Sequence, residues 1–241
     1  MAQALLAACG LDGQNLPPGL TLVRQHSAVD GSFLIAAVLG NRLKVSRDER
    51  VLLIAAHHNY SHYSSACLKL AYNLGPARDS GQLHFFDVSA EVARLYPVCP
   101  DLRTIRRCIT AFLEQSPGAT VLIDDLTFLL SYGHTESELI NLVEDLVLLP
   151  NKHSIVIKLN TAELFDWLCD NLVDMAEIEI RLEQLTSGNF REVDGRFSVS
   201  RINRRENSLI NMRTMDKPLL YKVNDRSIKV FVPGEVGIKH V

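Results

Sequence analysis

The sequence predicts an α/β fold with a mostly parallel sheet, helices on both faces of that sheet, and antiparallel hairpins toward the C-terminus. Short apolar segments alternate with amphipathic helical segments over the first two thirds of the chain. Parallel strands that are covered on both faces have this continuous apolar character. From residue 175 onward, apolar and polar residues alternate, which is typical of strands with one exposed face.

Five strands are expected in the parallel part, at the apolar segments 20–24, 50–56, 82–86, 120–124 and 154–159. Five helices are expected between and after them, at residues 32–43, 61–74, 102–115, 136–149 and 162–172. Thr135 and Glu138 have the spacing of a capping box at the start of the fourth helix. Gly75-Pro76 and Pro150-Asn151 are typical of the ends of such segments.

The C-terminal part, residues 175–241, is expected to form an antiparallel β extension. Residues 175–182 and 196–202 have strand patterns, and residues 219–223 and 228–232 flank a turn, which indicates a hairpin. No change of composition marks a linker. We therefore expect a single domain over residues 1–241, with residues 1–19 as an N-terminal extension.

The composition excludes several classes of protein. The chain is 47% hydrophobic and 22% charged, which is ordinary for a soluble globular protein. No apolar stretch reaches the roughly 18 residues of a membrane span, and the N-terminal residues lack the basic leader of a secretory signal. The five cysteines are scattered and form no C-x-x-C motif. This pattern indicates reduced thiols and a cytoplasmic or nuclear protein.

A phosphate-binding loop would lie between the first strand and the first helix. The P-loop motif G-x-x-x-x-G-K-[ST] aligns with Gln-His-Ser-Ala-Val-Asp-Gly-Ser at residues 25–32. Gln25 and Asp30 occupy the glycine positions, Gly31 occupies the lysine position, and only Ser32 matches. Side chains at the glycine positions restrict the backbone that should wrap a phosphate. The sequence therefore predicts a nucleotidase scaffold without its catalytic equipment or a bound cofactor.

Two carboxylates, Asp124 and Asp125, end the fourth apolar strand. In a nucleotidase, an acidic strand end holds Mg²⁺ through water. Without the glycine and lysine loop, this pair has little to coordinate. We expect both side chains to form hydrogen bonds with backbone groups of the following turn, because aspartate favours such turns.

Three histidines, His57, His58 and His62, follow the second strand. The i, i+4 spacing of His58 and His62 would place two imidazoles on one helix face. Zinc proteases have a glutamate after the first histidine, where this chain has Asn59. Because the pair has no evident third ligand, we expect polar loop residues rather than a metal site.

The residues around these histidines suggest two further activities. Tyr60 and Tyr63 could stack on nucleic acid bases, but we expect them to pack at the junction of strand and helix. The neighbouring serines lack the G-x-S-x-G motif of a hydrolase.

Charge is unevenly distributed along the chain. Residues 111–190 contain 3 Lys and Arg against 14 Asp and Glu, whereas residues 191–241 contain 11 against 6. Either solvated faces differ by chance, or complementary faces meet between subunits or touch a polyanion. The basic segment includes the adjacent Arg204 and Arg205. No RNP, KH or zinc-knuckle signature of a self-sufficient RNA-binding module accompanies it.

Several strings of residues together resemble the sixth subunits of Elongator complexes. They are Asp30-Gly-Ser-Phe-Leu34, Ser61-His-Tyr-Ser64, Ala77-Arg-Asp-Ser-Gly-Gln-Leu83, Leu122-Ile-Asp-Asp-Leu126 and Leu129-Leu-Ser131. Each string is a weak motif alone, whereas their order and spacing are specific. The resemblance covers residues 20–135 and weakens beyond them.

The resemblance implies a RecA-like fold that has lost its P-loop. It also implies a non-catalytic subunit that forms a hetero-hexameric ring with the fourth and fifth Elongator subunits. That ring binds tRNA and supports wobble-uridine modification by the catalytic Elongator subassembly. The family offers no catalytic, cofactor or metal residue to carry over.

Within such a ring, Arg204 and Arg205 are the candidate tRNA contacts. They could instead serve a subunit interface or face solvent. Two alternative functions stay open: a DNA-repair mediator related to RecA, and an active nucleotidase with an unusual phosphate loop and Asp124 on its metal.

Overall fold

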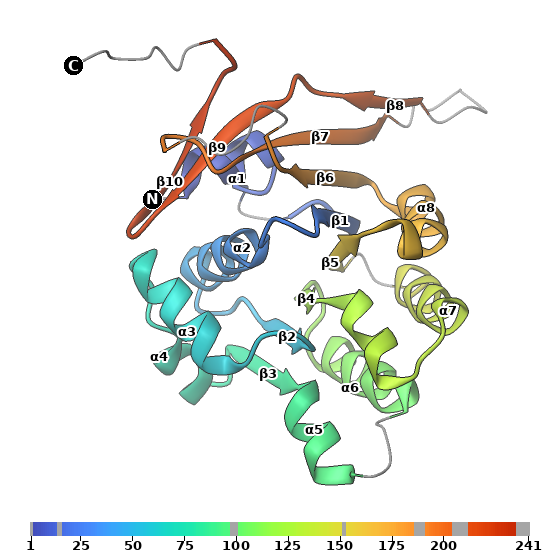
Figure 1. Ribbon diagram of the computed structural model, residues 1–241. Coiled ribbons are helices and arrows are strands. Elements are labelled where there is room, and N and C mark those ends of the chain that lie inside the picture. The colour runs from blue at the N-terminus through green and yellow to red at the C-terminus, as the bar shows by residue number, and fades with distance from the viewer. Residues whose placement is uncertain are drawn as a thin grey trace.

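The computed structural model describes residues 2–13, 16–96, 101–150, 153–185, 191–203 and 212–234. These residues form a ten-stranded sheet with the strand order β10-β9-β7-β6-β1-β5-β4-β2-β3, and β8 pairs with β7 outside this order. Figure 1 shows helices on both sides of the lower part of the sheet, while β7 to β10 form its upper end. The predicted α/β class with a mostly parallel sheet is confirmed.

The parallel part contains six strands of the described chain. They are β1 (Gly19–His26), β2 (Val51–Ala55), β3 (Leu83–Asp87), β4 (Thr120–Asp124), β5 (Ser154–Thr161) and β6 (Ile178–Glu183). β1 lies between β5 and β6 and is parallel to both. Because the strands are parallel, the residues that follow β1, β2, β4 and β5 meet at one edge of the sheet, which we call the carboxyl edge.

The described helices are α1 (Gln3–Cys9), α2 (Ser32–Val45), α3 (Tyr60–Lys69), α4 (Leu74–Asp79), α5 (Val88–Leu95), α6 (Leu102–Gln115), α7 (Glu136–Val147) and α8 (Asp166–Met175). Two 3₁₀ helices are η1 (Leu126–Tyr132) and η2 (Glu163–Phe165). One apolar core packs α1 to α4 against the sheet, and a second packs α6, α7 and α8 against the opposite face. Of these helices, none is both long and apolar enough to cross a bilayer.

The helix predicted over residues 61–74 is two helices. α3 ends at Lys69, and Ala71 has a left-handed φ of 59°. The side chain of Asn73 then accepts a hydrogen bond of 3.0 Å from the amide of Gly75 and starts α4. Pro76 therefore lies in the first turn of α4, where its missing N–H is not needed, and does not mark a helix end.

Other differences concern short segments with weak patterns. The last predicted helix, 162–172, is divided into η2 and α8. α1, α5 and η1 were not predicted, because each is short and gains its stability from packing rather than from a long amphipathic pattern. The capping box of Thr135 and Glu138 is confirmed: the amide of Thr135 donates to Glu138 Oε2 at 2.8 Å, and the amide of Glu138 donates to Thr135 Oγ1 at 3.3 Å.

The antiparallel part was predicted to begin at residue 175, but it begins one strand later, with β7. Met175 ends α8, and β6 pairs in parallel with β1 as well as antiparallel with β7. The alternating pattern of β6 suggested an exposed face, but Glu179 is fully buried. Its carboxylate binds the guanidinium groups of Arg24 at 3.1 Å and Arg181 at 2.6 Å. A buried charge with such partners has the same sequence pattern as an exposed one.

The antiparallel strands are β7 (Gly195–Asn203), β8 (Met212–Met215), β9 (Leu219–Asn224) and β10 (Ser227–Phe231). β9 and β10 form the predicted hairpin, in which Asn224 pairs with Ser227. β8 was not predicted. Arg204 and Arg205 lie outside the described residues.

Candidate functional site

The connection from β1 to α2 folds back onto the side chain of Gln25. Gln25 Oε1 accepts a hydrogen bond of 2.7 Å from the amide of Gly31, and its Nε2 donates one of 2.7 Å to Asn160 Oδ1. A Cβ atom at Gly31 would lie 2.8 Å from Leu182 Cδ1 and 2.9 Å from Gln25 Oε1. Gly31 therefore permits a close approach of Gln25, whereas the P-loop position that it occupies would carry a lysine.

The first amide of α2 binds a carboxylate of the chain itself. Asp30 Oδ1 accepts a hydrogen bond of 2.9 Å from the amide of Ser32, and Asp30 Oδ2 accepts one of 2.8 Å from the hydroxyl of Ser32. The N-terminus of a helix attracts anions, because its amides and its dipole are both positive there. Gln25 and Asp30 together take up the amides of Gly31 and Ser32, which would otherwise be open to a phosphate.

Asp124, at the end of β4, forms a buried ion pair. Its Oδ1 lies 2.5 Å from Lys158 Nζ on β5, and neither side chain is exposed. The hydroxyl of Tyr63 donates a hydrogen bond to Asp124 Oδ2. The expectation that Asp124 binds backbone groups of the next turn is therefore wrong. Burial and the Asp124 charge both raise the pKa of Tyr63 well above its usual value, so the phenol keeps its proton.

Asp125 does stabilise the following turn, as predicted. Its Oδ1 accepts hydrogen bonds from the amide of Thr127 at 2.9 Å and from the hydroxyl of Thr127 at 2.5 Å. Its Oδ2 accepts one of 2.5 Å from Asn160 Nδ2. A chain of hydrogen bonds therefore runs from Gly31 through Gln25 and Asn160 to Asp125. Burial raises the pKa of Asp125 to about 6, although Lys158 and Thr127 favour the charged form.

The histidines do not share a helix face. Asn59 caps α3 by accepting a hydrogen bond of 3.0 Å from the amide of His62, so His58 lies in the loop before the helix. The rings of His58 and His62 stack with centroids 3.8 Å apart and an angle of 5°. Burial and the neighbouring His58 lower the pKa of His62.

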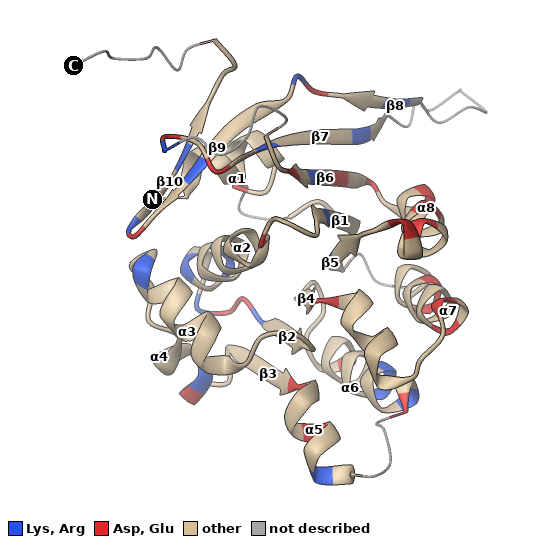
Figure 2. Cartoon of the chain, in the orientation of Figure 1, with Lys and Arg blue, Asp and Glu red and all other residues tan. Residues whose placement is uncertain are grey.

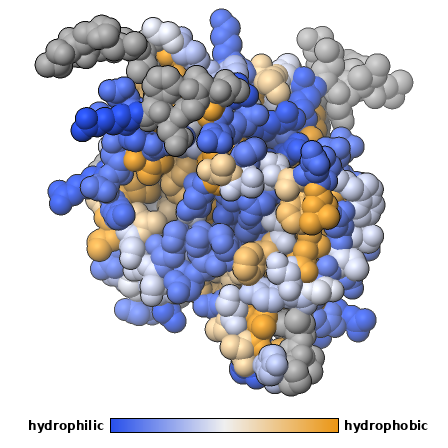
Figure 3. All heavy atoms as spheres, viewed as in Figure 1, coloured by the Kyte–Doolittle hydropathy of each residue, from blue (hydrophilic) through white to orange (hydrophobic). Residues whose placement is uncertain are grey.

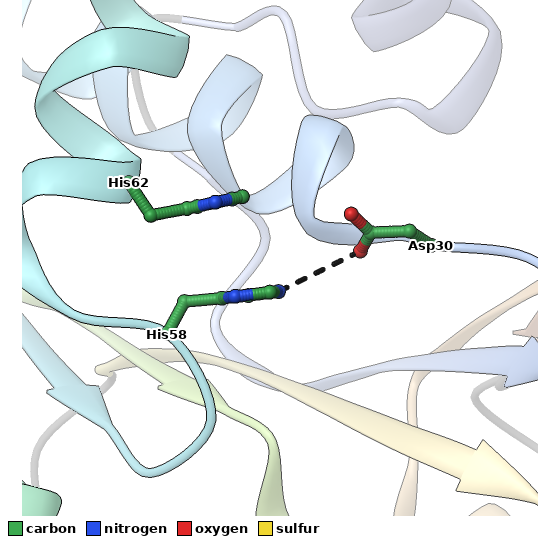
Figure 4. Close-up of side chains that lie close together, drawn as sticks. All are labelled: Asp30, His58 and His62. Atoms are coloured by element: carbon green, nitrogen blue, oxygen red, sulfur yellow. Dashed lines mark ion pairs between the residues drawn. The ribbon is translucent and has the colours of Figure 1, made fainter.

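A third possible metal ligand, Asp30, lies beside this histidine pair, although no third ligand was evident from the sequence. One ligand atom of each of Asp30, His58 and His62 lies within 4.8 Å of the others. Figure 4 shows the three side chains converging on one space from the loop before α2, the loop after β2 and α3. Only the two histidines had been recognisable as a pair, because Asp30 is distant from them in the sequence.

The aromatic residues of α3 pack at the junction of strand and helix, as predicted. Tyr63 is fully buried. The ring of Tyr60 packs edge-on against Phe85, with centroids 5.4 Å apart, and the guanidinium carbon of Arg78 lies 4.5 Å from the centre of the same ring. The Arg78 guanidinium therefore covers one face of the Tyr60 ring, which a base would have to share or displace.

A cavity of about 550 Å³ lies between α2, α3 and the β9–β10 hairpin. Asp30, Ser32 and His62 line one end of it, and Lys69 lines another part. The remaining lining includes apolar side chains of α2 and β10, such as Phe33 and Ile228. The site around Asp30 therefore opens into a space large enough for a small ligand.

Several basic residues of the C-terminal strands are structural. Arg201 forms an ion pair with Asp216. Arg213 donates hydrogen bonds of 2.7 and 2.8 Å to the carbonyl oxygens of Val173 and Ala176. Lys222 Nζ lies 2.6 Å from Asp194 Oδ1. These side chains therefore join strands and helices of the chain. Binding a polyanion would compete with these contacts.

Sequence reasoning missed Lys158 and Asn160, which complete the site. Lys158 lies within the apolar stretch of β5, and a charge in a buried strand needs a partner. That rule could have identified the residue, and the parallel register places it beside Asp124: Ile123 pairs with Ile157. Asn160 has no comparable signal, because an asparagine at a strand end is usually a turn residue.

Solved structures with the same fold include two archaeal proteins. The flagellar accessory protein FlaH of Methanocaldococcus jannaschii superimposes with a TM-score of 0.69 and 17% identity, over 96% of this chain and 97% of that chain. A KaiC-like protein of Pyrococcus horikoshii OT3 superimposes with a TM-score of 0.63 and 12% identity, over 90% and 91%. At these identities the likeness concerns the fold alone, which is RecA-like as the resemblance implied.

Curated relatives match most or nearly all of the chain. Elongator complex protein 6 of Drosophila melanogaster is 33% identical over 99% of this chain and 100% of that protein. Elongator complex protein 6 of Xenopus laevis is 25% identical over 97% and 98%, and that of Xenopus tropicalis is 26% identical over 86% and 88%. No family model matches. The full-length similarity to the fly protein shows that this chain belongs to the Elongator complex protein 6 family.

Proposed function

We propose that the chain is a non-catalytic subunit of the Elongator complex that supports wobble-uridine modification of tRNA. Its family is that of an Elongator subunit. One observation carries the non-catalytic part: the amides of Gly31 and Ser32 at the start of α2 already bind Gln25 and Asp30. A triphosphate would have to displace both side chains and would face a carboxylate.

The acidic strand end is occupied in a similar way. A nucleotidase needs a carboxylate at this point to hold Mg²⁺. Here Lys158 neutralises Asp124 at 2.5 Å, and Tyr63 binds its second oxygen. A metal ion at Asp124 would have to displace a buried ammonium, so magnesium-dependent nucleotide chemistry is disfavoured at this edge.

The partners that we propose are the fourth and fifth Elongator subunits, in a hetero-hexameric RecA-like ring that joins the catalytic subassembly. Rings of related subunits use head-to-tail contacts, in which two different faces meet. Figure 2 shows acidic residues gathered on α7 and α8. The net positive charge of residues 191–241, with 11 Lys and Arg against 6 Asp and Glu, would suit such an acidic face on a neighbouring subunit.

Apolar side chains on the same side of the molecule support a subunit contact there. Leu164, in η2, is 79% exposed, and Trp167, in α8, is 54% exposed. Figure 3 shows apolar residues on the side where Figure 1 places α7 and α8. Exposed tryptophan and leucine beside a charged rim are typical of protein interfaces.

The assembled ring, rather than this chain alone, would bind tRNA, with Arg204 and Arg205 as candidate contacts. We further propose that residues 1–241 form one domain and that the protein acts in the cytoplasm or the nucleus. The continuous sheet from β3 to β10 supports the first of these proposals.

Native mass spectrometry of the tagged chain, co-expressed with the fourth and fifth Elongator subunits, tests this function. We expect a complex that contains all three proteins. A well-folded monomer that ignores both partners would contradict the assembly role. Capture of recombination proteins in a pull-down from cells, without Elongator subunits, would favour the DNA-repair alternative.

A further inference from the structure

Three metal-ligating side chains from separate segments meet beside the start of α2. Asp30 precedes α2, His58 follows β2, and His62 lies in the first turn of α3. Their ligand atoms lie within 4.8 Å of one another (Figure 4). We propose that Asp30, His58 and His62 bind one zinc ion. This site is independent of the Elongator role and of any nucleotide.

The donor set favours zinc over the magnesium of a nucleotidase. Two imidazole nitrogens and one carboxylate oxygen are common zinc ligands, and sites with three protein ligands keep a fourth position open. Magnesium instead prefers oxygen ligands and keeps several waters. The proposed site is also distinct from Asp124, whose carboxylate is taken by Lys158 and Tyr63.

The ring nitrogen of His58 points to a missing ligand. Its Nε2 atom is buried and has no hydrogen-bond partner among the described residues. It faces Asp30 Oδ1 across 3.8 Å, which is too long for a hydrogen bond. Buried polar atoms almost always have a partner. A zinc ion bonded to both atoms would give His58 Nε2 its missing partner, and the spacing suits it, since two ligands about 2.1 Å from zinc lie roughly 3.4 Å apart at a tetrahedral angle.

Zinc binding requires a small rearrangement of the two rings. The rings of His58 and His62 are now nearly parallel, at 5°, so their lone pairs do not converge. His62 Nε2 lies 3.1 Å from Ser32 Oγ. On binding, His62 would rotate and exchange this hydrogen bond for the ion. Both imidazoles are partly exposed, which leaves room for the rotation.

The carboxylate is already held in position. The amide and the hydroxyl of Ser32 donate to the two oxygens of Asp30 at 2.9 and 2.8 Å. Hydrogen bonds of this kind orient ligating carboxylates in metal sites. The fourth coordination position would face the cavity of about 550 Å³ that Asp30, Ser32 and His62 line. A water molecule or a small ligand could occupy it.

The consequence for the fold is a cross-link at the carboxyl edge. The ion would join the loop before α2 to the loop after β2 and to α3. Zinc would bind the folded site more tightly than the unfolded chain. The free energy of unfolding should therefore rise with the logarithm of the zinc concentration.

Metal titration of the full chain tests the site. The protein is freed of metal with a chelator, and Zn²⁺ is added in a calorimeter while circular dichroism checks the fold of every variant. We expect one ion per chain with a dissociation constant in the micromolar range or below. His58→Ala and His62→Ala should each weaken binding at least about tenfold. His57→Ala removes a neighbouring imidazole outside the set and serves as the matched control.

Binding of Co²⁺ provides a second, spectroscopic test of the site. Co²⁺ in a site of this kind absorbs visible light, and the band should disappear in His62→Ala and persist in His57→Ala. If an alanine variant does not fold, His62→Gln keeps the size of the side chain and replaces it in the comparison. Absence of zinc binding to the folded wild-type chain would overturn the proposal. So would equal binding by both ligand variants, because zinc would then lie on other residues.

Discussion

The ammonium of Lys158 lies 2.5 Å from a carboxylate oxygen of Asp124, and neither side chain is exposed to solvent. Asp124 is the last residue of β4, and Lys158 lies in the adjacent parallel strand β5, three residues before its end at Thr161. The pair therefore joins β4 and β5 at the point where a nucleotidase of this fold would hold a metal ion. Its energetics can be measured without any knowledge of partners.

Lys158→Met should lower the free energy of unfolding by about 3–5 kcal/mol, because it leaves the buried charge of Asp124 without a counter-ion. Denaturant unfolding measures the change. The double variant Lys158→Met, Asp124→Asn should recover most of this loss, because no buried charge remains. Lys44→Met, at an exposed position of α2, should change stability by no more than about 0.5 kcal/mol. A loss below about 1 kcal/mol for Lys158→Met would contradict a buried ion pair.

Tyr63→Phe removes the hydroxyl that donates to Asp124 Oδ2. We expect a loss of about 1–3 kcal/mol, since a buried acceptor loses a partner. The effect should be non-additive with Asp124→Asn, because both changes remove the same contact. Tyr96→Phe is the matched control: Tyr96 is 82% exposed, and its hydroxyl reaches solvent. Equal effects of the two tyrosine changes would mean that the buried hydrogen bond contributes nothing.

Asp125 should make stability depend on pH between about 4 and 6. Burial raises its pKa from 3.8 to about 6 in the folded protein. Over this range the folded state keeps a proton that the unfolded state has lost, so the free energy of unfolding falls as pH rises and levels off above 6. The full effect is about 3 kcal/mol.

Asp125→Asn should abolish this dependence. The variant should resemble wild type near pH 4 and be more stable than wild type at pH 7.5, in urea unfolding at a series of pH values. Asp12→Asn, at an exposed position, should not alter the pH profile in this range. A difference between Asp125→Asn and wild type that stays constant from pH 4 to 7.5 would show that Asp125 does not titrate there.

Arg204→Glu, Arg205→Glu tests the proposed tRNA contact in the assembled ring. A phosphate contact carries no sequence information, so each lost arginine should weaken binding uniformly and lower the salt slope by about one. Filter binding at several salt concentrations measures both, and native mass spectrometry reports assembly. Weaker tRNA binding by an intact ring supports the contact, whereas a broken ring assigns the two arginines to an interface. Unchanged assembly and salt slope would exclude the contact.

The sequence predicted the architecture well because the strand patterns are strong. The apolar segments that became β1 to β5 are continuous, and the two-residue connection of β9 and β10 has a turn pattern. The site was predicted only in part. The mismatch with the P-loop motif could be read from Gln25 and Asp30, but their bonds to Gly31 and Ser32 depend on how the loop folds back.

The parts that sequence could not predict are those that join distant residues. Glu179 looked exposed because alternation cannot distinguish solvent from the guanidinium groups of Arg24 and Arg181. The third possible ligand of the histidine pair, Asp30, is distant in the sequence and lies next to the pair only in the folded chain. That residues 1–241 form a single domain stays a prediction.

Calorimetric titration of the isolated chain with Mg-ATP is the most direct test of whether side chains of the chain occupy the positions where a nucleotide would bind. We expect no measurable heat of binding, because Gln25 and Asp30 occupy the amides at the start of α2 and Lys158 occupies Asp124. An active RecA-like ATPase of the same fold is the positive control. Micromolar binding of Mg-ATP to the folded chain, lost on Asp124→Asn, would contradict the non-catalytic role and favour an active nucleotidase.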